Sequence, residues 1–331
     1  MRRTCPTYHR GALFRLATSA SRRRGAALYV YVLSVTMIVA MLGTAALTTV
    51  RLDRLATQQD SDLRQARRNA ESAIEMFLLF AKTRTNWRAA IKPNVEVGSV
   101  TFGGGSMAII VDDPADGDLA NDPYQPVTVR GIGRMGEAVW VSEVIVDPIP
   151  TPHDSRISEP TFSLVNATRP LSDDTWSAQF FKPQLPTEAV GWRVEYVEVF
   201  CQRDKDVDFS INLYTAGTDS KPETLLGGIV VPGNFVAPSM DWYRFDFPPQ
   251  PTLLSTQNMC IGFESTDSQS SLNFLVDSGL LTSSNSYMVL GSLSSGWTTV
   301  RTDRSLWYKV YGEYDTVHLE IRPGSWRRRS L

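Results

Sequence analysis

The sequence predicts an α+β region followed by an all-β region: a long N-terminal transmembrane and amphipathic helix with a small antiparallel sheet, and then a jelly-roll β-sandwich. Three observations predict this architecture. No charged residue occurs between Gly25 and Val50, a stripe at helical spacing continues to Phe80, and short apolar runs separated by turn residues follow Pro93. A chain of 331 residues is long enough for two or three separate cores.

The charge distribution separates a basic leader from an acidic body. Residues 1–25 contain seven arginines and no acidic residue, which leaves 26 basic against 35 acidic residues in the rest of the chain. An acidic body offers no broad cationic face to phosphates, so we expect no nucleic-acid partner. The sequence also contains no GxSxG, HExxH or phosphate-binding glycine motif, so we expect no enzymatic activity and no cofactor other than the calcium considered below.

The basic leader precedes a segment with the composition of a membrane span. Residues 25–50 are 26 uncharged positions. As a helix they would measure about 39 Å, which exceeds the bilayer core of about 30 Å. A secretory signal has a shorter apolar core, although a conventional cut after Ala45 remains an alternative. The arginines predict a single pass through the inner (cytoplasmic) membrane, with the N-terminus cytoplasmic and the C-terminal domains periplasmic or otherwise extracytoplasmic.

We expect the helix to continue beyond the membrane and to cover residues 26–92. Positions 52, 55, 59, 63, 66, 70, 73, 77 and 80 step by three and four and form a mainly apolar stripe with charged side chains beside it. No glycine or proline interrupts the chain between Thr44 and Pro93. The part of the stripe from Leu63 to Phe80 is therefore expected to be buried under the sheet that follows.

Two segments resemble a known family. RRRGAAL at 22–28 and ARRNAESAIEMFLLFAKTRTNWR at 66–88 are similar to the N-terminal region of type IV pilin-like proteins, in particular minor pseudopilins and pilus-assembly proteins of the K-type or X-type. The resemblance implies cleavage by a prepilin peptidase between Gly25 and Ala26. Major pilins carry a glutamate where this chain has Val30, and the K-type tip subunits lack it. A plain, uncleaved signal anchor remains the alternative.

Residues 93–150 are predicted to form a pilin-like β-meander, because four β-branched runs alternate with glycine-rich turns. An acidic loop, DDPADGDLANDP, lies between the second and third runs. Asp113, Asp116 and Asp118 could supply carboxylate oxygens to calcium, although no glutamate closes the loop as in an EF-hand. The resemblance also implies calcium, which some minor pseudopilins hold in such loops. The alternative is a solvated turn built from good turn residues.

The rest of the chain is divided by composition. The polar, proline-containing segment 151–159 is expected to be a linker, residues 160–314 a jelly-roll sandwich, and residues 315–331 a basic C-terminal tail. The order QFFKP, INLYTA, WYRFDF, GWTT and WYKVYG resembles jelly-roll modules of secreted and surface-anchored bacterial proteins. This resemblance implies a fold and a non-catalytic role, and it identifies no ligand.

Two sets of side chains in this region are candidate sites. Trp242, Trp297 and Trp307 could form a platform for a sugar ring, although tryptophans on strands more often fill a core. Cys201 and Cys260 lie on two predicted strands in an oxidising compartment, so they form either a disulfide or two buried thiols.

The sequence therefore favours an assembly function. We expect a membrane-anchored, pilin-like minor subunit of a type IV pilus or a type II secretion pseudopilus, with the sandwich displayed outward. Its expected partners are other pilin-like subunits, reached through the N-terminal helix, and the lipid bilayer. The alternative is a membrane-tethered sandwich that binds a glycan or a protein and does not enter a filament.

Overall fold

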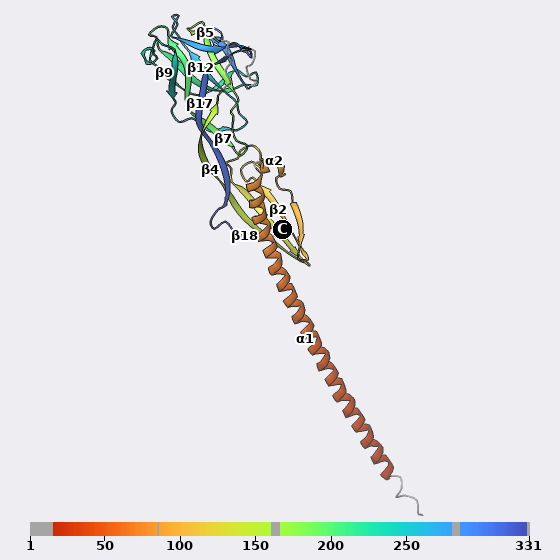
Figure 1. Ribbon diagram of the computed structural model, residues 1–331. Helices are drawn as coiled ribbons and strands as arrows, with labels where there is room; N and C mark the ends of the chain where they lie inside the picture. The colour runs from red at the N-terminus through yellow and green to blue at the C-terminus, as the bar shows by residue number, and fades with distance from the viewer. Residues whose placement is uncertain (1–15, 85, 160–165, 280–284, 330–331) are drawn as a thin grey trace, which may run out of the picture.

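The structure is a computed structural model that describes residues 16–84, 86–159, 166–279 and 285–329, with side chains from residue 26 onward. Helix α1 (Leu16–Thr83) is one long helix, and the short helix α2 (Trp87–Ala90) follows it. Figure 1 shows α1 projecting as a rod from a β-rich body. A long apolar helix followed by a large antiparallel β domain confirms the predicted fold class.

The described strands form two antiparallel sheets. Sheet A has 12 strands, with β1-β2-β3-β4-β17-β7-β13-β16 as its main order and β5, β10, β11 and β18 attached to that path. They are β1 (Val97–Phe102), β2 (Gly105–Asp112), β3 (Val127–Met135), β4 (Ala138–Ser158), β5 (Asn166–Leu171), β7 (Gly191–Arg203), β10 (Asp241–Asp246), β11 (Leu253–Leu254), β13 (Leu272–Asp277), β16 (Ser305–Leu306), β17 (Tyr308–Ile321) and β18 (Arg327–Arg329).

Sheet B has six strands in the order β15-β14-β6-β12-β8-β9. They are β6 (Trp176–Phe181), β8 (Phe209–Ala216), β9 (Pro222–Val231), β12 (Met259–Glu264), β14 (Ser286–Ser292) and β15 (Gly296–Arg301), and a 3-10 turn, η1 (Gly233–Phe235), follows β9. Sheet B faces the distal part of sheet A across a large apolar core, so this half of the chain is a β-sandwich.

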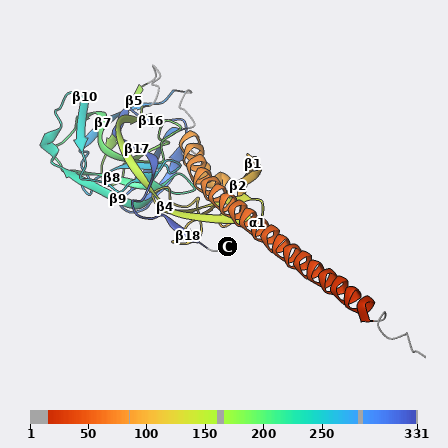
Figure 2. The ribbon, with the colours of Figure 1, turned by 90° about the horizontal axis from the view of Figure 1, so that it is seen from below.

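The second half of α1 lies on the first part of sheet A (Figure 2). Ala66, Ala70 and Ala73 are buried there, as the helical stripe predicted. They meet glycines: a Cβ atom added to Gly131 or Gly133 of β3 would overlap the backbone carbonyl oxygens of Ala70 and Ala66. The helix and the sheet therefore approach closely because neither carries a large side chain at the contact.

Two predicted domain boundaries differ from the structure. Residues 151–158 are not a linker, because they form the second half of the long strand β4, and residues 315–321 are not a tail, because they belong to β17. β4 and β17 pair from Ser158 with Val310 to Val146 with Ile321. The sandwich is thus inserted between two strands that continue from the helix-packed part of sheet A.

The prolines that suggested a linker lie where β4 has one unpaired edge. Beyond Val146, β4 pairs with β17 but no longer with β3. Pro148, Pro150 and Pro152 alternate along the strand. Their missing N–H groups therefore all fall on one side, which is the side that has no ladder to complete. We call residues 63–147 and 318–329 the proximal module, and residues 157–315 the sandwich.

Candidate functional site

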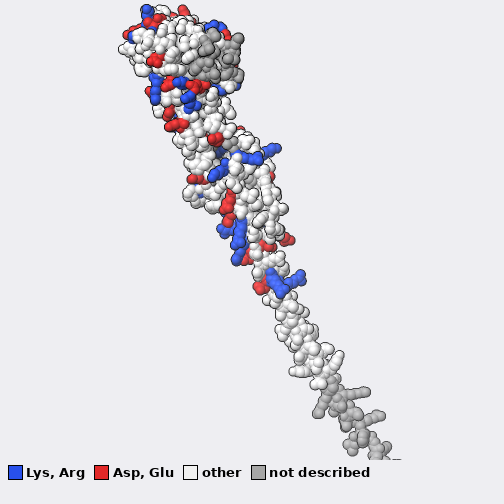
Figure 3. Space-filling model, in the orientation of Figure 1, with Lys and Arg blue, Asp and Glu red and all other residues white. Residues whose placement is uncertain are grey.

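The exposed apolar first part of α1 is the first candidate site. Residues 26–83 contain a helix long and apolar enough to cross a membrane, and residues 26–60 are exposed on every side. Residues 26–50 carry no charged side chain, and Figure 3 shows a stretch of the rod without blue or red atoms below the first charged groups. The hydroxyls of Ser34, Thr36 and Thr44 donate to backbone carbonyls three or four residues earlier, at 2.8 to 2.9 Å, so their polar groups are satisfied within the helix.

The proposed processing site lies in the same helix. Gly25 and Ala26 are both within α1, and the earlier leader residues 1–15 lie outside the described part of the chain. Val30 is 62% exposed. It presents an apolar side chain at the position where major pilins carry a glutamate.

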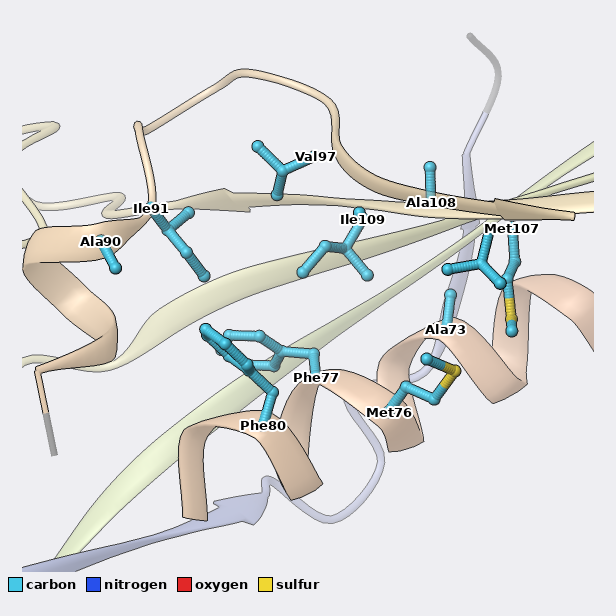
Figure 4. Close-up of a pocket in the computed structure, with 12 residues that line it drawn as sticks. Ala73, Met76, Phe77, Phe80, Ala90, Ile91, Val97, Met107, Ala108 and Ile109 are labelled. Atoms are coloured by element: carbon cyan, nitrogen blue, oxygen red, sulfur yellow. The ribbon is translucent and has the colours of Figure 1, made fainter. Parts of the chain in front are cut away.

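An apolar groove opens on the flank of the proximal module, between α1 and the hairpin of β1 and β2 (Figure 4). It has a volume of about 300 Å³, and Met76, Phe77, Phe80, Val97 and Met107 are among its lining residues. Phe80, at the end of the predicted stripe, is only half-buried. Without converging polar side chains, the groove is suited to apolar contact rather than to chemistry.

The acidic loop between β2 and β3 is a series of turns. Asp113, Asp116 and Asp118 each accept a hydrogen bond from the backbone N–H two residues later, at 2.8 to 2.9 Å. Among the described residues, no three His, Cys, Asp or Glu side chains converge so that they could hold a metal ion. Asp113 is buried and its Oδ2 lacks a hydrogen bond. Calcium binding by this loop stays a prediction.

The same loop braces the base of the sandwich, a role that the sequence did not reveal. Arg88 of α2 donates to the carbonyl oxygen of Gln125 at 2.6 Å, and the Tyr124 hydroxyl donates to Asp315 Oδ2 at 3.0 Å. Burial and this hydrogen bond raise the pKa of Tyr124, so the phenol stays protonated. Asp315 is also 3.7 Å from Arg193, on the sandwich strand β7.

The two cysteines are free thiols on different sheets, so the disulfide alternative is wrong for this structure. Cys201 faces the core between the sheets, whereas Cys260 belongs to a small cluster on the outer face of sheet B. Burial raises the pKa of Cys201 to about 12 and also raises the pKa of Cys260. Both are therefore inert apolar side chains at neutral pH.

The structure divides the three candidate tryptophans between two faces. Trp242 and Trp307 lie on the outer face of sheet A, where their rings stand 5.3 and 5.6 Å from Phe200. Lys309 Nζ lies 4.2 Å from the centre of the Trp242 ring. The neighbouring Tyr196 is covered in the same way by Arg244, at 3.6 Å. Cations therefore already occupy ring faces on this side of the molecule.

Trp297 lies on the opposite, outer face of sheet B. A Cβ atom added to Gly291 would be 2.8 Å from its Cε3 atom, and one added to Gly262 would be 3.0 Å from its Cζ2 atom. The indole thus rests against two glycines of neighbouring parts of the sheet. A glycine inside a strand can mark such a close approach. The glycines in CIGFE and YMVLGS are therefore the sequence signal of this contact.

The C-terminal arginines form a strand of the proximal module, and their side chains are exposed. β18 pairs with residues 141–143 of β4. Glu143 is buried and binds Arg130 at 3.1 Å and Arg329 at 2.9 Å, and Arg328 lies over the Trp140 ring at 4.2 Å. β18 therefore adds a short strand to the sheet on which α1 packs.

No family model and no curated protein matches the sequence. Solved structures show weak similarity. The structure of infectious bursal disease virus Gx strain is 11% identical, with 71% of this chain and 67% of that chain covered and a TM-score of 0.21. Clostridium perfringens delta-toxin is 7% identical, with 71% and 100% covered and a TM-score of 0.10. Similarity at these TM-scores identifies neither the fold nor the function of this chain.

Proposed function

We propose that this protein is a membrane-anchored, pilin-like minor subunit that takes part in assembling a type IV pilus or a type II secretion pseudopilus. The observation that carries the proposal is the division of α1 into two environments. Residues 26–60 are exposed on all sides, whereas Ala66, Ala70 and Ala73 are packed on the sheet. The exposed apolar part would lie in lipid before assembly and against helices of sister subunits afterwards.

The position of the sandwich supports a role at the end of a filament. β4 and β17 carry the sandwich beyond the proximal module, at the far end from the apolar rod (Figure 1). A bulky head at that position would obstruct the addition of another subunit beyond it. In this proposal the partners are other pilin-like subunits and the bilayer, the role is non-enzymatic, and no nucleic acid is bound.

The first test is the N-terminal residue and intact mass of the protein extracted from native membranes. We expect the chain to start at Ala26, with or without a methyl group, and a Gly25→Leu variant to keep its leader. Gly43→Ala is the matched control, because a Cβ atom at Gly43 meets nothing within 4 Å. A wild-type chain that starts at Met1 would contradict pilin-type processing.

A second test asks whether the rod meets other pilin-like helices. A photocrosslinking residue at Met37, which is 57% exposed, should capture sister subunits in native membranes. The same residue at Leu225, which is 57% exposed on the sandwich strand β9, is the control and should not capture them. Equal capture at both positions would count against helix-mediated assembly.

A tethered binding module is the second candidate function. The arrangement around Trp297 on the outer face of sheet B is the specific observation that favours it. The two functions are compatible if the subunit displays a binding surface.

A further inference from the structure

The Trp297 indole is held by small residues beneath it. The ring occupies the space that a side chain would need at Gly262 of β12 and at Gly291 of β14. Ala178 of β6 is buried in the same cluster. Aromatic neighbours meet the indole at an angle: Trp176 is tilted by 50° at 5.6 Å, and Tyr214 stands at 74° at 6.3 Å. The two glycines therefore support the ring, and no stacked neighbour is recorded for it among the described aromatic pairs.

Polar side chains lie beside the ring on the same face. The Tyr214 hydroxyl donates to Glu264 Oε1 at 2.6 Å, and Asn212 lies two residues before Tyr214 on the same face of β8. Asn212, Tyr214 and Glu264 are all half-buried. A carboxylate has about four acceptor sites, so one phenol leaves Glu264 able to accept further hydrogen bonds. An aromatic surface with a few fixed polar groups is the usual composition of a small-ligand site.

The outer face of sheet A provides the contrast. Its aromatic rings are also half-buried, but Lys309 lies over Trp242 and Arg244 lies over Tyr196. There the electron-rich ring faces are matched by cations of the same chain. The contacts of Trp297 are with two glycines and with two rings that are inclined to it rather than stacked on it. Its outward face is therefore the better surface for an external ligand.

We propose that the outer face of sheet B binds a neutral hexopyranose unit of a glycan, stacked on Trp297 and hydrogen-bonded through Glu264 and Asn212. A pyranose with equatorial hydroxyls has one flat side of polarised C–H groups, which suits the negative face of an indole. Its hydroxyls project at the edge, where the polar side chains lie. The Glu264 carboxylate and the excess of 35 acidic over 33 basic residues disfavour anionic sugars.

This inference goes beyond the assembly role and stands whether or not α1 enters a filament, because every residue of the site belongs to the sandwich. The test therefore uses the full chain in phosphatidylcholine nanodiscs, which carry no sugar headgroup. Cellopentaose and chitopentaose are the probes, and saturation-transfer NMR is the measurement. We expect saturable binding of at least one probe, with the strongest transfer to the ring C–H protons of one pyranose face.

Substitutions locate the site. Trp297→Ala should weaken binding by about tenfold, which corresponds to the loss of one well-stacked aromatic contact. Trp242→Ala on the other sheet is the matched control and should bind as the wild type does. Glu264→Gln keeps the shape of the side chain and should weaken binding about threefold, so it tests the site even if Trp297→Ala does not fold.

Three results would overturn the proposal. The first is that neither probe binds at 10 mM, a concentration of about the order at which a single weak sugar contact saturates. The second is that Trp242→Ala weakens binding as much as Trp297→Ala does. The third is that transfer is no stronger than with empty nanodiscs. The start of the mature chain at Ala26 is measured separately, so failure of this proposal is distinguishable from failure of the assembly proposal.

Discussion

Where α1 meets β3, the proximal module brings backbone against backbone beside an apolar cluster that includes Ile74 and Phe77, whereas the interior of the sandwich is filled by large side chains packed against one another. In the proximal module, Ala66 and Ala70 of α1 lie directly on Gly131 and Gly133 of β3, and an added Cβ atom would meet a carbonyl oxygen. In the sandwich, Trp192, Phe181, Phe263 and other large residues fill the space between the sheets and are fully buried.

This difference determines which change each region tolerates. A contact made of small residues has no room for a further atom, so it is sensitive to enlargement. A core made of large residues loses contacts and leaves a cavity when one of them is shortened. The long apolar helix α1 is therefore attached to the sheet by a close fit, and the sandwich is stabilised mainly by the area that it buries.

The largest effect is expected from truncation in the sandwich. Trp192 is fully buried, packs 5.8 Å from Phe181 and donates its indole N–H to the carbonyl oxygen of Leu254 at 3.2 Å. Trp192→Ala should lower the free energy of unfolding by about 4 kcal/mol. Denaturant unfolding of the detergent-solubilised chain measures it. Trp326→Ala is the control, because Trp326 is 45% exposed, and an equal loss in both variants would refute the packing argument.

The next effect is expected from enlargement in the proximal module. Gly133→Ala would place a methyl group against the Ala66 carbonyl oxygen, so α1 must shift from the sheet, at a cost of about 3 kcal/mol. Limited proteolysis should then cleave α1 near residue 66 before it cleaves the sandwich. Gly43→Ala, at a position with open space, should leave the cleavage pattern unchanged. An intact α1 in Gly133→Ala would show that the close fit is not required.

The comparison also shows which parts of the fold the sequence could predict. Periodicity identified the buried stripe, because Ala66, Ala70 and Ala73 repeat at helical spacing along one face. It could not show that residues 151–158 are a strand, because prolines are excluded from a paired ladder but not from an open edge. The partner that makes this segment a strand, β17, returns only after the inserted sandwich, more than a hundred residues later.

The candidate sites were also predictable only in part, because contacts between segments that are distant in the sequence form them. Cys201 and Cys260 were recognised as strand residues, but only the alternation of inner and outer faces separates them. Trp297 was recognised as an aromatic candidate, whereas Gly262 and Gly291 were not recognised as its support, because the contact joins strands that are distant in the sequence. The role of Tyr124 in bracing the sandwich has no local sequence signal.

The smallest effect is expected from an exposed ion pair between β4 and the end of β17, at the boundary of the proximal module. Arg322 binds Asp147 through two hydrogen bonds, of 2.6 and 2.9 Å, and these bonds hold the pKa of Asp147 below its ordinary value of 3.8. A carboxyl group whose pKa is lower in the folded state stabilises that state at pH values above its unfolded pKa, and this contribution disappears as the pH falls through the folded pKa.

Asp147→Asn should therefore lower the melting temperature by about 1 °C between pH 5 and 7, since exposed ion pairs contribute little. The difference should shrink as the pH falls past 3.8 and vanish once the pH is below the lowered pKa of folded Asp147. A difference that instead grows on acidification would show that Asp147 acts through some contact other than its ion pair with Arg322.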